Sequence, residues 1–204
     1  TTLFSAYLAA LRASGLVQLD LSALDALRDE PSLIVAPNHP SLIDVVLVVS
    51  RLPRVVCIMK AELGENVFLG GAARLADYIR NESPLGMTRS AARALRAGSQ
   101  LLVFPEGTRT RHGPVDAFKG GFALIAKRAG APVQTVFIET NSPFLGKGWP
   151  LLKKPAFPLI YRARLGQRFE VSGEVKSFVS ELECYYRDTL TPPPAPADLW
   201  SGSH

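Results

Sequence analysis

Short apolar segments typical of strands alternate with amphipathic segments of about ten residues along most of the chain. The strand candidates include residues 33–36, 54–59, 101–104, 132–138, 159–165 and 168–172. The helix candidates include residues 22–27, 66–75, 88–97 and 121–129. This alternation predicts an α/β domain in which a central, mostly parallel mixed sheet is flanked by helices. Ligands of such sheets bind at the carboxyl ends of the strands. The turns that directly follow the apolar segments are therefore the first places to look for chemistry.

The 204 residues are enough for one domain with a buried core. We expect an N-terminal amphipathic helical segment over residues 1–30, a main domain over residues 31–190 and a proline-rich tail over residues 191–204. The first helix is predicted from Leu3, Phe4, Tyr7, Leu8 and Leu11, which share one face. No stretch of the sequence approaches the roughly 18 consecutive apolar residues of a membrane-spanning helix.

Two cysteines and three histidines exclude several kinds of site. Cys57 and Cys184 are too few for a disulfide scaffold. A zinc site of clustered histidine and cysteine is not supported, so we expect no metal. Cys57 lies between valine and isoleucine in a predicted strand, where a core position is expected.

Positive charge is concentrated in residues 103–168, which contain 11 lysines and arginines and 3 acidic residues. A segment of this kind favours an anionic partner such as a phosphate, a coenzyme, a lipid headgroup or a nucleic acid. Nucleic acid is not expected, because the basic residues lack the interleaved aromatic side chains of a stacking platform, and Phe104 and Phe118 are expected in the core. A solvated basic surface without a partner is the plain alternative.

The first polar turn after an apolar segment reads Asn38-His39-Pro40-Ser41-Leu42-Ile43-Asp44. If His39 lies in the turn and Asp44 in the first turn of the next helix, the carboxylate can reach back to one ring nitrogen. The other ring nitrogen would then be free to act as a base. The plain alternative is that the two residues serve as loop and cap residues. Ser41 is expected to cap the helix.

A nucleophile to complete a triad is missing from this turn. The pattern Gly-x-Ser-x-Gly does not occur in the sequence. The simplest interpretation is that the nucleophile is a hydroxyl of the substrate, deprotonated by His39.

The second polar turn reads Phe104-Pro105-Glu106-Gly107-Thr108-Arg109. Gly107 allows backbone amides to approach an anion, Thr108 adds a hydroxyl donor, and Arg109 offers a planar guanidinium for a phosphate. Lys119 is among the basic residues that extend the positive field. No P-loop pattern is present, so nucleotide hydrolysis is not supported. A glycine turn with exposed charges is the alternative interpretation.

Together the two turns resemble the glycerolipid acyltransferase family, which includes 1-acyl-glycerol-3-phosphate acyltransferases. The 62 residues from Asp44 to Glu106 are similar to the spacing in that family. Tyr78-Ile79-Arg80 looks like the family's second block, and Ala131-Pro132-Val133 resembles its fourth. The resemblance spans about residues 31–140, within the domain expected over 31–190.

This resemblance implies a one-step O-acyl transfer in which His39 takes the acceptor's proton while Asp44 holds the imidazole. Arg80 and Arg109 would bind acceptor phosphate together with Gly107 and Thr108, and Glu106 would position an arginine or the acceptor. Supporting roles are expected for Asn38, Lys60 and Lys119. The donor would be acyl-CoA or acyl carrier protein, the acceptor a lysolipid, and no cofactor is expected.

The acceptor is the least specified part of this hypothesis. Relatives in amino-acid-lipid or polyene-pigment pathways acylate other hydroxyls, and the family pattern does not require the stretch over residues 134–150. Residues 141–158 are expected to form a loop rich in proline, glycine, lysine and aromatic residues. A non-catalytic lipid- or coenzyme-binding module is a further alternative. The first helix and the aromatic and basic residues of 143–158 suggest contact with an anionic membrane surface. We therefore expect a cytoplasmic protein attached peripherally to the inner face of a membrane.

Overall fold

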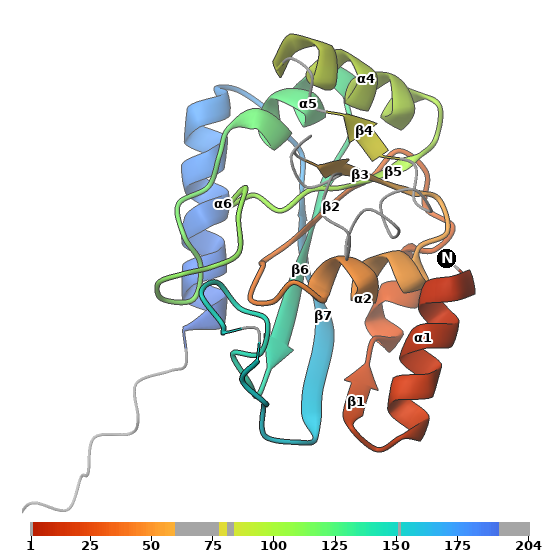
Figure 1. Ribbon diagram of the computed structural model, residues 1–204. Helices are drawn as coiled ribbons and strands as arrows, with labels where there is room; N and C mark the ends of the chain where they lie inside the picture. Colours follow the sequence, from red (N-terminus) through yellow and green to blue (C-terminus); the bar gives the residue numbers. More distant parts are fainter. Residues whose placement is uncertain (1, 60–77, 81–83, 151, 192–204) are drawn as a thin grey trace, which may run out of the picture.

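The computed structural model describes residues 2–59, 78–80, 84–150 and 152–191, and a seven-stranded sheet forms the centre of this part of the chain (Figure 1). The strands are β1 (Val17–Asp20), β2 (Ile34–Pro37), β3 (Val55–Met59), β4 (Tyr78–Arg80), β5 (Gln100–Leu102), β6 (Val133–Thr140) and β7 (Leu159–Phe169). Their order is β1-β7-β6-β2-β5-β3-β4, and every neighbouring pair is parallel except β6 with β7. The predicted mostly parallel mixed sheet is confirmed.

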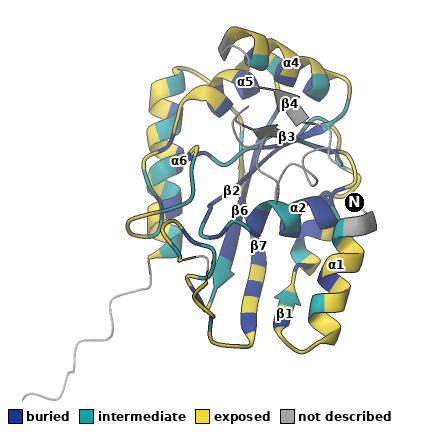
Figure 2. Ribbon diagram, viewed as in Figure 1, coloured by how far each residue is buried: buried dark blue, intermediate teal, exposed yellow. Residues whose placement is uncertain are grey.

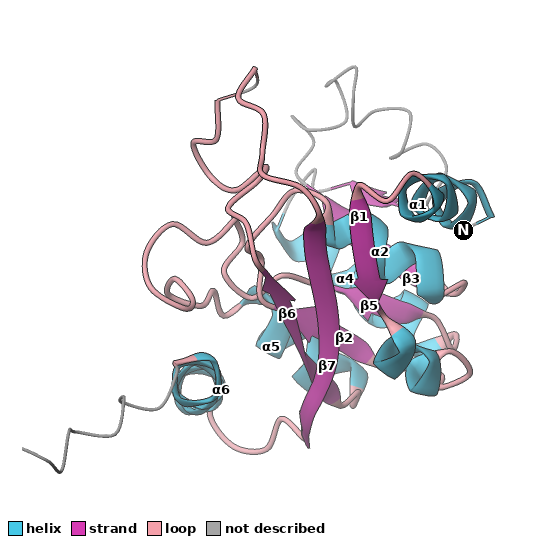
Figure 3. Ribbon diagram, turned by 90° about the horizontal axis from the view of Figure 1, so that it is seen from below, coloured by secondary structure: helices cyan, strands magenta, loops and turns pink. Residues whose placement is uncertain are grey.

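Helices cover both faces of the sheet, so the domain has three layers. The helices are α1 (Thr2–Ala13), the 3₁₀ helix η1 (Ser22–Leu27), α2 (Asp44–Arg51), α4 (Pro84–Arg96), α5 (Gly121–Ala129) and α6 (Val175–Leu190). One apolar cluster joins α1, η1 and α2 to the sheet, and a second joins α4, α5 and α6 to its other face. Figure 3, seen from below, shows α1 and α6 on opposite sides of β6 and β7.

The central strands are buried on both faces, as expected for parallel strands between two helical layers. In β2, Val35 belongs to the cluster beneath α2, whereas Ile34 and Ala36 belong to the cluster beneath α4 and α5. All four residues of β2 are buried, and Figure 2 shows the same along much of β6. The continuous apolar run that predicted this strand is thus explained by two-sided burial.

A buried tyrosine attaches α6 to the middle of the sheet. The hydroxyl of Tyr186 donates to the carbonyl of Ala36 in β2 and accepts from the backbone N–H of Val136 in β6 at 3.2 Å. Complete burial raises the pKa of Tyr186, so the hydroxyl remains a neutral donor. This contact fixes α6 where β2 and β6 run side by side.

Several predicted elements have the bounds or the type that the sequence indicated. Helix α5 runs from Gly121 to Ala129 as predicted, and Gly130 ends it with φ +66° in the left-handed region. The helix predicted over residues 22–27 is present as a 3₁₀ helix. The two late strands predicted over 159–165 and 168–172 form one strand, β7. The helix expected over residues 66–75 lies outside the described residues.

The N-terminal segment contains one strand that the sequence pattern did not predict. Strand β1 pairs in parallel with β7, with Val17 opposite Leu159 and Asp20 opposite Arg162. The segment expected to be an amphipathic helix also packs on the domain: Leu8 is 4% exposed, and Phe4 and Leu11 contact the core. The apolar face of α1 is therefore largely used within the domain. None of the described helices is long and apolar enough to cross a membrane.

Candidate functional site

The two polar turns meet because β2 and β5 are adjacent, parallel strands. Val35 of β2 lies opposite Leu102 of β5, so both strands end at the same edge of the sheet. Asn38 and His39 follow β2, and residues 103–110 follow β5. The carboxyl-end rule for ligand sites thus brings together two segments that are 62 residues apart in sequence.

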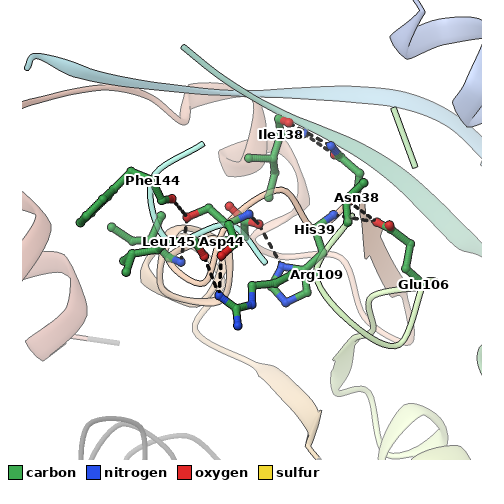
Figure 4. Close-up of polar contacts among 12 residues, drawn as sticks. Asn38, His39, Asp44, Glu106, Arg109, Ile138, Phe144 and Leu145 are labelled. Carbon is green, nitrogen blue, oxygen red and sulfur yellow. Dashed lines mark hydrogen bonds and ion pairs between the residues drawn. The ribbon is translucent and has the colours of Figure 1, made fainter. Parts of the chain in front are cut away.

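His39 and Asp44 form the buried pair that the sequence predicts (Figure 4). The Nδ1 atom of His39 lies 3.0 Å from Oδ2 of Asp44, and Asp44 is 0% exposed. The backbone N–H of Ser41 donates to the same carboxylate oxygen at 2.7 Å. A carboxylate partner at Nδ1 favours the tautomer that carries its proton there, which leaves Nε2 as the proton-accepting nitrogen.

Burial is the main influence on the charge of Asp44. It raises the pKa of Asp44, while the hydrogen bond and the electrostatic interaction with His39, the N–H of Ser41 and the nearby positive charge of Arg109 lower it. The carboxylate is therefore desolvated but aimed at one imidazole nitrogen. This arrangement suits a residue that orients a base.

The predicted helix cap at Ser41 is wrong. Helix α2 begins at Asp44, and its N-cap residue is Ile43, which makes no side-chain cap hydrogen bond. The Ser41 hydroxyl instead donates to the carbonyl of Phe144 at 2.8 Å. Ser41 lies three residues before the helix begins, and the loop between β6 and β7 supplies a carbonyl that accepts from its hydroxyl.

Phe104 fixes the other side of the imidazole. Its ring stacks on that of His39 with centroids 3.8 Å apart and an angle of 19° between the planes. Sequence reasoning assigned Phe104 to the core and missed this contact. The sequence feature that could have indicated the contact with His39 is the position of Phe104 at the start of the second turn, directly before Pro105.

Asn38 extends the pairing of β2 with β6 by one side chain. Its amide donates to the carbonyl of Ile138 at 3.0 Å and its carbonyl oxygen accepts from the N–H of Ile138 at 2.7 Å. Figure 4 shows both bonds directed away from the imidazole of His39. Asn38 thus holds the start of the first turn against the sheet.

Glu106 accepts three hydrogen bonds, one of which links the second turn to the first. Its Oε1 accepts from the backbone N–H of His39 at 3.0 Å and from the hydroxyl of Thr110 at 2.9 Å, and its Oε2 accepts from the N–H of Asp116 at 2.8 Å. Glu106 is 1% exposed, and burial raises its pKa although these donors lower it. The carboxylate therefore contacts the backbone that carries His39.

The remaining residues of the second turn form its outer part. Gly107 has φ +68°, and a Cβ atom there would lie 3.3 Å from Cγ of Lys119, whose N–H donates to the carbonyl of Pro105. The Nη1 atom of Arg109 donates to the carbonyls of Leu145 at 2.8 Å and Gly146 at 3.0 Å. The guanidinium thus binds the loop between β6 and β7 on one side.

Two predicted site residues are described in part or not at all. Arg80 is the last residue of β4, opposite Met59 of β3, so its backbone lies at the same edge of the sheet as both turns. Lys60 lies outside the described residues. In the described part of the chain, no group of three His, Cys, Asp or Glu residues could hold a metal ion.

Comparisons with known proteins concern the fold and the segment of the chain that contains both turns. The family model described as Acyltransferase matches residues 18–139. A 1-acyl-sn-glycerol-3-phosphate acyltransferase of Pseudomonas aeruginosa is 26% identical over 172 residues, which cover 81% of this chain and 65% of that protein. A lyso-ornithine lipid O-acyltransferase of the same species is 33% identical over 129 residues, covering 57% of this chain and 49% of that protein. The matched part is thus less than two thirds of either relative.

A solved structure is similar to the whole domain. The crystal structure of the 1-acyl-sn-glycerophosphate acyltransferase of Thermotoga maritima matches with a TM-score of 0.62 and 22% identity, covering 85% of this chain and 70% of that one. At this identity the likeness concerns the fold. The residues matched by the family model include both polar turns but end before the loop between β6 and β7.

Proposed function

Because the chain belongs to the Acyltransferase family, we propose that it transfers a fatty acyl group from a thioester to the hydroxyl of a lysophospholipid such as 1-acyl-glycerol-3-phosphate. The donor would be acyl-CoA or acyl carrier protein. The observation that carries the proposal is the His39–Asp44 pair, 3.0 Å apart with a fully buried carboxylate at the edge of the sheet.

The proposed reaction needs one base and no enzyme nucleophile. Nε2 of His39 takes the proton of the acceptor hydroxyl as its oxygen attacks the thioester carbonyl. The C–S bond then breaks, and the departing thiolate receives the proton back from His39. Asp44 holds the ring and stabilises the imidazolium between these steps, and Phe104 restricts its tilt.

Glu106 acts in this proposal as a positioning residue. Its carboxylate accepts from the backbone N–H of His39 in the first turn, from the hydroxyl of Thr110 and from the backbone N–H of Asp116. The positive groups expected to bind an acceptor phosphate are Arg80 and Arg109, assisted by Gly107 and Thr108. In support of this role, Arg109 uses only Nη1 for its hydrogen bonds to the described residues, so Nη2 and Nε can donate to a ligand.

The test is product identification with the purified chain. Acyl-CoA and acyl carrier protein are each offered with 1-acyl-glycerol-3-phosphate, and mass spectrometry detects the diacyl product and the free fatty acid. Diacyl product from wild type but not from His39→Ala supports the proposal. Free fatty acid without diacyl product would indicate a thioesterase, and bound but unreacted lipid would indicate the non-catalytic alternative.

A second acceptor class is favoured by one specific observation. The similarity to a lyso-ornithine lipid O-acyltransferase makes a lysolipid with an amino-acid headgroup the alternative acceptor. The chemistry at His39 would be the same, because only the hydroxyl reacts. Including such a lipid in the product assay distinguishes the two acceptors.

We further propose that the protein meets its lipid at an anionic membrane surface, on the inner face of a membrane in the cytoplasm. Support comes from the loop between β6 and β7, where Leu152 is 95% and Phe157 52% exposed. Lys153 and Lys154 are exposed between them, and Lys153 lies over the ring of Trp149. Apolar side chains flanked by cations suit an interface of this kind.

A further inference from the structure

The loop between β6 and β7 is fastened to both polar turns. The carbonyl of Leu145 accepts from the backbone N–H of Leu42 at 3.1 Å, close to the bond from the Ser41 hydroxyl to Phe144. Gly146 fits tightly, because a Cβ atom there would lie 2.9 Å from the carbonyl oxygen of Pro143 and 3.2 Å from that of Pro40. Residues 144–147 of the loop are therefore a wall of the site.

This fastening changes what Arg109 can offer to a ligand. Nη1 donates both of its hydrogens to loop carbonyls, at 2.8 Å to Leu145 and 3.0 Å to Gly146, as Figure 4 shows for Leu145. Nη2 and Nε make no hydrogen bond within the described part of the chain. Arg109 therefore has one edge for an anion, and a phosphate with several oxygens needs further donors.

Lys147 brings a second positive charge to the same place. Its ammonium lies 3.3 Å from the hydroxyl of Thr108, the neighbour of Arg109. Lys147 is exposed, and among the described residues no carboxylate forms an ion pair with it. The ammonium of Lys147 thus lies beside the hydroxyl of Thr108, next in sequence to Arg109, and forms no ion pair with a carboxylate of the described residues.

We propose that Lys147 determines acceptor specificity by binding the anionic headgroup of the lysolipid together with Thr108 and Arg109. This inference rests on the proposed function and deepens it. Lys147 lies beyond residues 18–139, which the family model matches, so the subsite adds a charge from outside that segment. A phosphate monoester fits these donors better than a zwitterionic amino-acid headgroup, because Lys147 adds to Arg109 a positive charge that no carboxylate of the described residues pairs with.

The test compares Lys147→Ala, Lys147→Glu and Lys147→Arg with Lys176→Ala, a change at an exposed lysine of α6. Binding of a short-chain, water-soluble 1-acyl-glycerol-3-phosphate is measured by calorimetry, and KM and kcat are measured for it and for the monoacylglycerol that lacks the phosphate. We expect Lys147→Ala to raise Kd and KM for the phosphate-bearing lipid about 5- to 20-fold, and Lys147→Glu to raise them more. Lys147→Arg should retain most binding. The KM for the monoacylglycerol, the KM for acyl-CoA and the kcat should each change less than twofold.

The outcomes separate this inference from the proposed function. A Lys147→Ala effect no larger than that of Lys176→Ala, or one confined to the KM of acyl-CoA, overturns the subsite. Wild-type protein that acylates other lysolipids but binds no phosphate-bearing one overturns it as well and leaves the chemistry intact. Lys147-dependent binding of 1-acyl-glycerol-3-phosphate without any acyl transfer supports the subsite and overturns the proposed function.

Discussion

The backbone N–H of His39 donates to Oε1 of Glu106 at 3.0 Å, so the turn that carries the proposed base is held by a carboxylate from the other turn. Both partners are buried, and the bond joins residues 67 positions apart. The position of the imidazole therefore depends on contacts from both polar turns and is not set by the local sequence around His39 alone.

Substitutions in the His39–Asp44 pair should lower turnover in a fixed order. His39→Ala removes the base and is expected to reduce kcat by roughly 10²- to 10⁴-fold. Asp44→Asn keeps the shape of the side chain but loses the charge that stabilises the imidazolium, so its effect should be smaller. Steady-state kinetics on variants with native circular dichroism checks this order. Near-normal turnover by folded His39→Ala protein would exclude the base mechanism.

Glu106→Gln should affect both stability and kcat. The amide can keep the bonds from His39 and Thr110 but cannot accept from the N–H of Asp116, which is left unpaired. We expect a loss of about 1–3 kcal/mol in unfolding free energy. The displaced turn should lower kcat with little change in the KM of acyl-CoA. Urea unfolding and steady-state kinetics on the same preparation measure the unfolding free energy and kcat. An unchanged kcat would show that Glu106 does not position His39.

The raised pKa of Glu106 predicts a specific pH dependence of stability. Burial makes the folded protein bind this proton more tightly than the unfolded chain, whose carboxyl has its ordinary pKa of 4.5. Unfolding free energy contributed by Glu106 should therefore fall as pH rises from 4.5 to above the raised pKa. Glu106→Gln removes the titrating carboxyl, so the unfolding free energy of the variant should decline less than that of the wild type over this pH range. Parallel stability profiles of the two proteins would contradict the prediction.

Two glycines should respond oppositely to alanine. At Gly166 in β7, a Cβ atom would lie 2.4 Å from the Thr135 hydroxyl and 2.5 Å from the ring of Phe137, so Gly166→Ala should cost about 1–3 kcal/mol. At Gly121, at the start of α5, a Cβ atom meets nothing within 4 Å. Gly121→Ala should be neutral or stabilising by up to about 1 kcal/mol. Thermal and urea unfolding of both variants provides the comparison.

Arg109→Lys should release the loop between β6 and β7. Lysine keeps the charge but cannot donate from one planar group to the carbonyls of both Leu145 and Gly146. We expect faster amide hydrogen exchange in residues 142–150 and a higher KM for a phosphate-bearing acceptor. Arg111→Lys, at the exposed residue two positions on, is the matched control. Unchanged exchange in the loop would show that Arg109 does not hold it.

Membrane association should depend on the exposed part of the same loop. Leu152→Ser combined with Phe157→Ser should reduce co-sedimentation with vesicles of phosphatidylglycerol and phosphatidylcholine, because the apolar anchor is lost. Leu85→Ser, at a 69% exposed leucine of α4, is the control. Binding should weaken with salt if Lys153 and Lys154 contribute. Equal binding by the double variant and wild type would contradict this surface.

The parts of the fold and site that sequence could predict are those that depend on local pattern. The continuous apolar run predicted β2, and the five-residue separation of His39 and Asp44 allowed their contact to be anticipated. Gly130 indicated the end of α5 locally as well, because glycine adopts a positive φ more readily than other residues. Each of these features needs no knowledge of distant segments.

The parts that sequence could not predict depend on pairing between distant segments. Strand β1 has only four residues at a sheet edge and gains its partner from Leu159 onward. The bonds that the backbone N–H of His39 donates to Glu106 and that Arg109 donates to the carbonyl of Leu145 likewise arise from the packed fold. Polar contacts of this kind follow from topology, because any carbonyl in reach could have served as the acceptor.

The antiparallel pairing of β6 with β7 has a consequence for how acceptor preference can diversify. Because β7 returns beside β6, with Tyr161 opposite Thr140, the connection between them begins and ends at the edge that carries both turns. It crosses no other strand and needs no helix to reverse direction. Segments of different length and charge can therefore be exchanged over residues 141–158, provided that the new segment keeps the hydrogen bonds that Ser41, Leu42 and Arg109 donate to residues 144–146. The connection between β6 and β7 is therefore the segment to exchange when the headgroup preference of one acyltransferase is to be introduced into another.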